Sequence, residues 1–439
     1  MNNTVPYTDM KDSGIKWIGS VPASWNVRTP YQLATRVNNK NSDLSEQNLL
    51  SLSYGKIKRK DINTNDGLLP ASFDGYNIIE AGDIVLRLTD LQNDHTSLRV
   101  GHATERGIIT SAYTTLRPIN PAHSRYLYYL IHAFDLKKGF YGMGSGVRQG
   151  LNYDEVKELK TVVPSQKEQD AITSFLDAQC SNIEDLILES KGIIEELKQW
   201  RAAIIQETVT KGLSDKAPRK KSQLEWIEDI PATWETARLK ALFTFGKGLP
   251  ITKENLVETG VAVISYGQIH SKTNLGTRIT EDLIRYVPES YLTSNPDSLV
   301  KKYDLLMADT SEDLAGCGNC VYVETDGQLF AGYHTIILRS VHKRSNKYLS
   351  YLFKSDAWRS QIRTRVSGVK LFSISRKILG ALTVLLPPEE EQVRIVEYLD
   401  RKCELIDSIV TEKELLIAEL EVYKRSLIYE TVTGKRKVV

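Results

Sequence analysis

The feature that most constrains this 439-residue chain is that it repeats itself. The segment Ser13–Trp25 returns as Ser222–Trp234, with both tryptophans, the proline and the Trp-Ile step kept. Farther along, Val163–Gln169 returns as Leu386–Gln392 at an offset of 223. Because self-similarity on this scale means that one architecture is used twice, we predict two copies of one fold in a single chain.

Between these landmarks the two copies match only in places. Ser53–Ile57 resembles Ser265–Ile269, and the offset drifts from 212 to 222, which places insertions and deletions in loops. Since loops on a fixed scaffold usually carry recognition, we predict two α+β domains with different recognition surfaces. The predicted strands include Asp83–Leu88, Val261–Ser265 and Thr335–Leu338, and the predicted short helices are Arg125–His132 and Lys347–Lys354.

A second pattern, an apolar period of 3.5 residues, follows in each copy. The series is Ile172, Leu176, Gln179, Ile183, Leu186, Ser190, Ile193, Leu197, Trp200 and Ile204, and its copy is Ile395, Leu399, Lys402, Ile406, Ile409, Lys413, Leu416, Leu420, Tyr423 and Leu427. Such a period, held over more than four heptads, is typical of a coiled-coil seam. Pro164 and Pro387 mark the helix starts, and Gly212 and Gly434 mark the ends. Each helix should therefore have about 45 residues and a length of roughly 65–70 Å.

Composition limits the class of protein without naming a partner. The chain has 57 basic and 55 acidic residues, so its net charge of +2 does not by itself indicate nucleic-acid binding. No apolar run approaches the roughly 20 residues of a membrane span. Four cysteines and a polar start without a signal peptide indicate free thiols in a reducing compartment. We therefore expect a soluble cytoplasmic protein with no membrane partner.

Two variable domains, each followed by a near-identical long helix, resemble the specificity subunits of type I restriction-modification enzymes. The resemblance covers almost the whole chain. Its marks are Lys16-Trp-Ile-Gly19 with Pro22 and Trp25, the Gly82-Asp-Ile-Val85 strand, the Ser-Gly-Val loops at 145 and 367, and the Pro-x-x-x-x-Gln helix starts. Two departures, Ser165 where the second copy has Pro388 and Tyr303 in place of a glycine, concern local loop geometry.

The resemblance implies an α+β protein without catalytic residues. Two similar target-recognition domains would be separated by two long antiparallel coiled-coil helices in a pseudo-twofold arrangement. Each domain would read one half of a bipartite, asymmetric site in double-stranded DNA. The helices would set the spacing and dock two adenine-N6 methyltransferase subunits, with restriction/translocase subunits as further partners. The expected parts are target-recognition domain 1 at 1–160, a long helix at 164–212, a basic linker at 213–222, target-recognition domain 2 at 223–384, a long helix at 387–434 and a basic tail at 435–439.

The candidate DNA contacts are basic, amide and aromatic side chains near strand ends and in loops. They are Arg36, Lys40, Tyr54, Lys56, Arg87 and Arg148 in the first half, and Lys247, Tyr266, Gln268, Arg278, Arg365 and Lys370 in the second. Gln268 stands where the first copy has Lys56. Because Gln suits the N6/N7 edge of adenine and Lys suits O6/N7 of guanine, this exchange could change the base that is read. The alternative for each residue is a solvated surface side chain.

Motifs for catalysis or cofactor binding are missing. Asn295-Pro-Asp297 is only a turn, Gly142–Gly146 lacks the third glycine of a dinucleotide-binding motif, and Gly434-Lys-Arg436 is no phosphate-binding loop. Cys317 and Cys320 have zinc-knuckle spacing, and His334 could add a third ligand, but a fourth is not visible. We expect no catalytic residue, no metal and no cofactor. Two other functions stay open: a coiled-coil scaffold that binds protein without DNA specificity, and, less favoured, a self-contained nuclease or methyltransferase.

Overall fold

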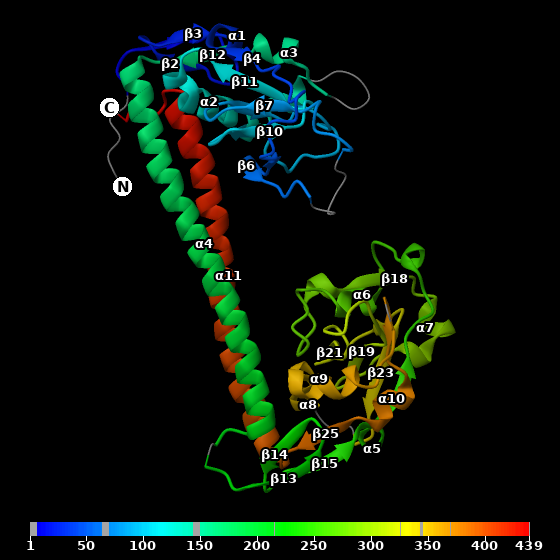
Figure 1. Cartoon of the computed structure of the whole chain (residues 1–439). Helices are drawn as coiled ribbons and strands as arrows, with labels where there is room; N and C mark the ends of the chain where they lie inside the picture. Colours follow the sequence, from blue (N-terminus) through cyan, green and yellow to red (C-terminus); the bar gives the residue numbers. More distant parts are fainter. Residues whose placement is uncertain are drawn as a thin grey trace. The chain divides into compact units, whose positions relative to one another are not determined.

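The computed structural model of the protein describes residues 7–63, 70–143, 150–214, 216–324, 326–342, 346–368 and 370–438. The chain forms two compact units. Unit 1 comprises Met1–Ser190 and Glu414–Val439, and unit 2 comprises Lys191–Lys413. Each unit therefore contains one globular domain, the first half of the long helix that follows it, and the second half of the other long helix (Figure 1).

Unit 1 is organised around a four-stranded antiparallel sheet. Its strand order is β4 (Ala34–Arg36), β11 (Thr114–Pro118), β8 (Ile84–Leu86) and β9 (Val100–His102). Helix α2 (Ser124–Leu136) packs on this sheet through Leu127 and Ile131, which are almost fully buried. Smaller antiparallel pairs are β1 (Met10–Asp12) with β2 (Ser20–Pro22), β3 (Asn26–Arg28) with β12 (Thr161–Val163), β5 (Leu50–Ser53) with β6 (Lys56–Arg59), and β7 (Asn77–Ile79) with β10 (Gly107–Ile109), and the short helices are α1 (Pro30–Leu33) and α3 (Tyr153–Lys157).

Unit 2 repeats that sheet. The order is β16 (Phe243–Lys247), β23 (Thr335–Ser340), β19 (Leu305–Ala308) and β21 (Cys320–Tyr322), again antiparallel, with α8 (Lys347–Lys354) and α9 (Asp356–Arg363) beside it. A second sheet has the order β18 (Arg285–Val287), β17 (Val261–Ile264) and β22 (Leu329–Ala331). The remaining elements are β13 (Arg219–Leu224), β14 (Ile227–Pro231), β15 (Glu235–Arg238), β20 (Thr310–Ser311), β24 (Phe372–Ser373), β25 (Thr383–Leu386), α5 (Leu239–Leu242), α6 (Tyr266–Ile269), α7 (Tyr291–Ser294) and α10 (Arg376–Ala381). The mixed α+β class and the duplication predicted from the sequence are confirmed.

The repeated tryptophans join each globular domain to a long helix. Trp25 is fully buried, and its Nε1 donates to Oε1 of Glu168 at 3.2 Å. In unit 2 the equally buried Trp234 donates to Oε2 of Glu391 at 3.1 Å. A buried indole N–H needs an acceptor, and in both units the first turn of the following helix supplies it. The repeated Pro-Ala-x-Trp segment is therefore a joint between domain and helix.

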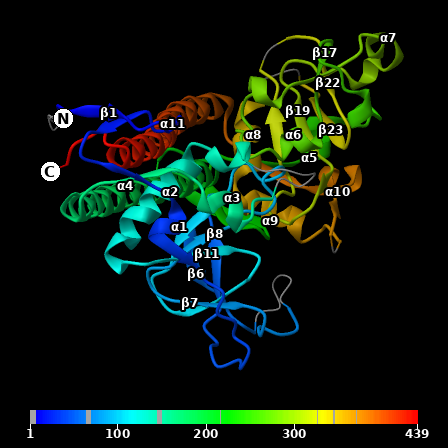
Figure 2. The same cartoon turned by 90° about the horizontal axis from the view of Figure 1, so that it is seen from above.

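The two long helices are α4 (Gln166–Lys211) and α11 (Glu389–Val432), and they lie side by side and antiparallel (Figures 1 and 2). Their lengths of 46 and 44 residues match the prediction. Each helix starts two residues after its proline, and Gly212 and Gly434 adopt φ angles of +81° and +70° just beyond the ends. Glycine favours this left-handed conformation because it has no Cβ. None of the described helices is long and apolar enough to cross a membrane.

The predicted seam of α4 is only partly correct. Leu176 and Ile183 are buried as predicted, but farther along the helix Leu186 and Trp200 are each 49% exposed. An α-helix has 3.6 rather than 3.5 residues per turn, so the buried face of a straight helix drifts by roughly 20° per heptad away from a strict seven-residue pattern. Farther along α4, the residue that is buried is therefore often the one after the residue that the series predicts. The buried apolar residues of α4 outside that series are Cys180, Ile194, Ile205 and Val209.

Candidate nucleic-acid interface

Three of the predicted DNA contacts of unit 1 are exposed side chains in or after β-strands. Arg36 ends β4 and is exposed, with its guanidinium 5.6 Å from the ring centre of Tyr153. Lys40 is exposed, and its Nζ donates to the carbonyl of Gly75 at 3.0 Å. Tyr54 is 75% exposed and has a φ of +48° in the turn between β5 and β6. These side chains face solvent, as a DNA contact requires.

Two further candidates of unit 1 already have partners within the protein. Lys56 begins β6, and its Nζ lies 2.6 Å from Oε2 of Glu184 in α4. Arg87 follows β8 and lies 3.6 Å from Asp94. Both therefore already lie beside a carboxylate of the protein. Arg148 lies outside the described residues.

Four of the six candidates of unit 2 are also exposed, and Tyr266 and Gln268 are partly buried. Lys247 ends β16, and Lys247, Arg278, Arg365 and Lys370 are all exposed. Tyr266 is partly buried at the start of α6. Gln268 caps that helix, because its Oε1 accepts from the backbone N–H of Ser265 at 3.2 Å. Gln268 therefore stabilises the start of α6, a role that the sequence comparison with Lys56 did not reveal.

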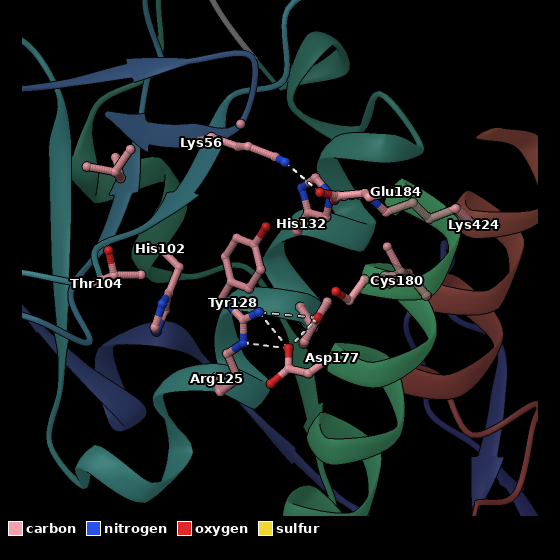
Figure 3. A pocket seen from close by; sticks show the side chains of 15 residues that line it. Lys56, His102, Thr104, Arg125, Tyr128, His132, Asp177, Cys180, Glu184 and Lys424 are labelled. Carbon is pink, nitrogen blue, oxygen red and sulfur yellow. Dashed lines mark hydrogen bonds and ion pairs between the residues drawn. The ribbon is translucent and has the colours of Figure 1, made fainter. Parts of the chain in front are cut away.

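A cavity of about 430 Å³ lies in unit 1 between the globular domain and the helix pair (Figure 3). Its walls come from β6 and β9 on one side and from α4 and α11 on the other, with α2 between them. Lys56 and Lys424 both bind Glu184 at one edge. Burial alone would raise the pKa of Glu184, but the hydrogen bonds from Lys424 and Lys56 outweigh it and lower that pKa. Glu184 is therefore ionised and holds two cations at the rim.

Arg125 and two tyrosines form the opposite edge of this cavity. Arg125 donates to Oδ1 of Asp177 through Nε and Nη2, at 2.8 and 2.5 Å, and its guanidinium lies over the rings of Tyr128 and Tyr129. Tyr129 also donates to Oδ1 of Asp177, at 2.6 Å. Burial and this bond raise the pKa of Tyr129 well above its usual range. The edge is a fixed hydrogen-bonded network (Figure 3).

Two histidines of the same cavity are neutral. Ser124 donates its only hydroxyl hydrogen to the carbonyl of Gly82, so it must accept from Nε2 of His102, 2.9 Å away. The Nδ1 of His102 therefore carries a lone pair, and neither it nor the buried Nδ1 of His132 has a partner among the described residues. Burial lowers the pKa of each imidazole to about 4.

Unit 2 fills the corresponding space. The matching cavity, between α8 and the helix pair, measures about 50 Å³ and is lined by Lys347, Tyr351, Asp400, Cys403 and Asp407, among others. Lys354 stands at the position of His132 and donates to the carbonyls of Asn274 and Leu275 at 3.3 and 2.6 Å. Burial lowers the pKa of Lys354 to about 7. The two units thus share a scaffold but differ in the size of this cavity and in the side chains at matching positions around it.

A different cavity, of about 530 Å³, opens among the loops of unit 2. It lies between α6 and the loop that joins β19 to β21, and we call it the loop cavity. Its lining residues are Tyr266, Gly267, His270, Ser311, Glu312, Asp313, Ala315, Gly316 and Asn319. None of these is a lysine or an arginine. Of the predicted contacts that the structure describes, only Tyr266 lines it.

Comparison with known proteins places this architecture. The model of the type I restriction modification DNA specificity domain matches residues 231–419. The MjaVIII type I restriction enzyme specificity subunit of Methanocaldococcus jannaschii is 24% identical over 89% of this chain and 84% of its own length. The putative MjaX specificity subunit of the same organism is 26% identical over 74% of this chain and 71% of its own. Residues 231–419 therefore match a type I restriction modification DNA specificity domain, and the chain as a whole is similar to specificity subunits of type I restriction-modification enzymes.

The fold agrees with this assignment. A solved chain, from work on complex assembly and conformational transition of the type I R-M system, superposes with a TM-score of 0.66 at 14% identity, over 94% of this chain and 98% of that chain. Members of the family are the DNA-specificity subunits of their complexes and are not catalytic. The resemblance seen in the sequence is confirmed.

The two cysteines with zinc-knuckle spacing belong to the core of unit 2. Cys317 and Cys320 are buried in the main apolar cluster of unit 2, and burial raises the pKa of both thiols. His334 is bound to Asp309, whose Oδ1 lies 2.8 Å from its Nδ1. In the described part of the chain no group of three or more His, Cys, Asp or Glu side chains could hold a metal ion.

Sequence reasoning missed most of the loop cavity. It examined the loop for Cys317 and Cys320 and passed over Ser311, Asp313 and Asn319 beside them. The glycines at 316 and 318 were the available signal, because a loop that brings polar side chains close together often needs glycine. In unit 1 the matching loop, after β8, is shaped by the fully buried Arg99, which was also missed and which donates to the carbonyls of Thr89 and Asp90.

Proposed function

We propose that this specificity subunit reads a bipartite, asymmetric site in double-stranded DNA, one half with each globular domain. The observation that supports the proposal most is the contrast between repeated joints and unrepeated surfaces. Trp25 and Trp234 make the same bond to the following helix in both units. The loops after β8 and β19, at matching places in the two sheets, instead carry Arg87 in unit 1 and Glu312 with Asp313 in unit 2. Different surfaces on one scaffold suit two different half-sites.

The proposed recognition domains are residues 1–160 and 223–384, joined by a basic linker at 213–222, with a basic tail at 435–439. The exposed candidates Arg36, Lys40, Tyr54, Lys247, Arg278, Arg365 and Lys370 are suited to contacts with phosphates or bases. Lys56 and Arg87 are suited to a positioning role, because each is already bound to a carboxylate. We place the complex in the cytoplasm, together with its DNA.

The long helices would set the spacing and dock two adenine-N6 methyltransferase subunits, with restriction/translocase subunits joining that core. Helices of 44 and 46 residues are roughly 65–70 Å long, enough to hold two readers apart. A partner that binds twice needs the same surface twice. Trp200 and Tyr423 meet this condition, since they occupy matching positions in the two helices and are 49% and 48% exposed. Large exposed aromatic side chains are frequent anchors of protein interfaces.

The test is a genome-wide map of N6-methyladenine in the source organism, with the gene intact, deleted and carrying residues 28–160 of another family member. Deletion should remove one split, asymmetric methylated motif. The chimera should change only one half of that motif, because each domain reads alone. A map that is unchanged by deletion would contradict the specificity role. A chimera that alters both halves would contradict independent reading.

Salt dependence separates DNA reading from the scaffold alternative. A complex that neutralises phosphates releases counterions, so its affinity for the mapped site should fall steeply as salt rises. A coiled-coil scaffold without DNA specificity should show no such site and no such slope. The measurement requires the complete complex and a duplex that contains the mapped motif.

A further inference from the structure

The loop cavity of unit 2 presents hydrogen-bond acceptors. His270 donates from Nε2 to the carbonyl of Thr310 at 2.7 Å, so in the neutral ring its Nδ1 accepts from the amide nitrogen of Asn319 at 3.1 Å. The side-chain oxygen of Asn319 is therefore still able to accept a hydrogen bond from a ligand. Ser311 likewise donates its hydrogen to the carbonyl of Asp313 at 2.7 Å and retains only lone pairs.

Two carboxylates add to this set of acceptors. Oδ1 of Asp313 accepts from the backbone N–H of Gly316 at 2.6 Å, which leaves Oδ2 available. Glu312 is exposed, and neither carboxylate has an ion-pair partner in the described part of the chain. The nearby Arg359 is occupied, because it donates to the carbonyls of Phe353 and Ala315 at 2.7 and 3.1 Å. The side-chain oxygens of Ser311, Asp313, Glu312 and Asn319 therefore offer acceptors to a ligand that supplies hydrogen-bond donors.

Gly316 keeps these acceptors accessible. A Cβ at this position would lie 2.5 Å from Oγ of Ser311 and 3.1 Å from Nδ1 of His270. A side chain would therefore occupy the space between the acceptors. The φ of Gly316 is not in the left-handed region, so the space rather than the backbone conformation favours glycine here.

The rings of Tyr266 and His270 line the same cavity, and Tyr333 lies next to Tyr266. The ring of Tyr266 lies 6.2 Å from the ring of His270 and 6.2 Å from that of Tyr333, and Tyr333 lies 4.0 Å from His334. Tyr333 is 43% exposed. An exposed ring next to acceptors is suited to contact with a nucleobase. The negative charge and the absence of cations among the lining residues are unsuited to a phosphate.

We propose that the loop cavity reads an exocyclic amino group, N4 of cytosine or N6 of adenine, in the half-site of the second domain. In the major groove these are the only hydrogen-bond donors that the bases present, and carboxylates and amide oxygens accept from them. Glu312, Asp313 and Asn319 would determine specificity at that base pair. This inference rests on the proposed function, because it assumes that the second domain reads DNA.

The test is an amine-deletion scan with the complete methyltransferase complex and a duplex that carries the mapped site. Each adenine is replaced in turn by purine and each cytosine by 2-pyrimidinone, which lack only the amino group. With the unaltered protein, replacement of the base whose amino group contacts Glu312 and Asp313 should weaken the affinity for the duplex by roughly ten- to a hundredfold. Whether the sensitive base is adenine or cytosine identifies the source of the amino group.

Variants connect that position to the loop cavity. Glu312→Ala with Asp313→Ala should reduce the effect of the sensitive replacement to within about twofold while leaving the other positions unchanged. The control, Glu254→Ala with Glu258→Ala, removes the same charge from exposed positions of unit 2 and should keep the full effect. Full retention in the cavity variant would overturn the proposal.

The scan with the unaltered protein still tests the proposal if the cavity variant does not fold. Binding that is insensitive to every amine deletion would overturn the proposal while leaving DNA specificity intact. Absence of any sequence-specific binding would instead contradict the proposed function itself. The two failures are therefore distinguishable.

Discussion

In unit 1, Glu184 of α4 forms an ion pair with Lys424 of α11. Unit 2 has an equivalent ion pair, in which the acid comes from α11 and the base from α4. There Asp407 of α11 lies 3.0 Å from Nε of Arg201 in α4. Asp407 and Lys424 stand 223 residues after Glu184 and Arg201, the offset that relates the two helices in the sequence. Acid and base thus occupy equivalent positions in both copies, which fixes the antiparallel register of each half of the pair.

Removing the acid should destabilise unit 1 more than unit 2. Glu184 binds both Lys424 and Lys56, whereas Asp407 binds Arg201. Because these side chains are partly exposed, we expect Glu184→Gln to lower the free energy of unfolding by about 1 kcal/mol and Asp407→Asn by less. Urea unfolding of the two variants measures the difference. Adding Lys424→Met to Glu184→Gln should recover part of the loss, and full additivity would show that the pair does not interact.

The glycines after the two helices should differ in their tolerance of a side chain. A Cβ at Gly434 would overlap Cδ of Pro22, while one at Gly212 would lie 3.0 Å from Oε1 of Glu391. Both residues have positive φ, so alanine costs about 1 kcal/mol at either position. Gly434→Ala should cost more, because a proline ring cannot move aside as a carboxylate can. Equal melting temperatures for the two variants would contradict this reasoning.

The sequence predicted this architecture well because the repeat and the apolar period depend on local spacing. Pro164 and Gly212 located α4 to within two residues at either end. The face of the helix was harder, since Leu186 and Ile187 are neighbours and only packing decides that Leu186 is exposed. The loop cavity could not be predicted, because Tyr266 and Asn319 are brought together by tertiary structure alone.

Unit 1 should lose stability in acid partly through His132. Burial, followed by the charges of Lys424 and Arg125, lowers the pKa of His132 from 6.5 to about 4 in the folded protein. Between these values the unfolded chain binds the extra proton, so stability falls as the pH drops from about 6.5 towards 4. The full effect on the free energy of unfolding is roughly 3 kcal/mol.

Comparison with His132→Phe isolates this contribution. The phenyl ring keeps an aromatic contact with Tyr128, whose ring stacks on His132 at 5.4 Å, but it cannot be protonated. Asp135, with its pKa raised to about 6 by burial, titrates in the opposite direction in both proteins and cancels in the difference. Urea unfolding at pH 7.5 and 4.5 should show a smaller acid loss in the variant. Equal losses would mean that His132 is protonated or accessible in the folded protein.

The matched aromatic residues Trp200 and Tyr423 give the sharpest test of partner docking. If each anchors one methyltransferase subunit, Trp200→Ala or Tyr423→Ala should weaken the binding of one copy by about 2 kcal/mol, roughly thirtyfold, and the double variant should weaken both. Because both side chains are half exposed, their removal should change the stability of the isolated chain little. Leu188→Ala is the control, since Leu188 is 70% exposed but corresponds to Thr411 in the other helix. Native mass spectrometry of the complex over a range of methyltransferase concentrations gives the stoichiometry, and two bound subunits at unchanged affinity in the double variant would exclude these residues as anchors.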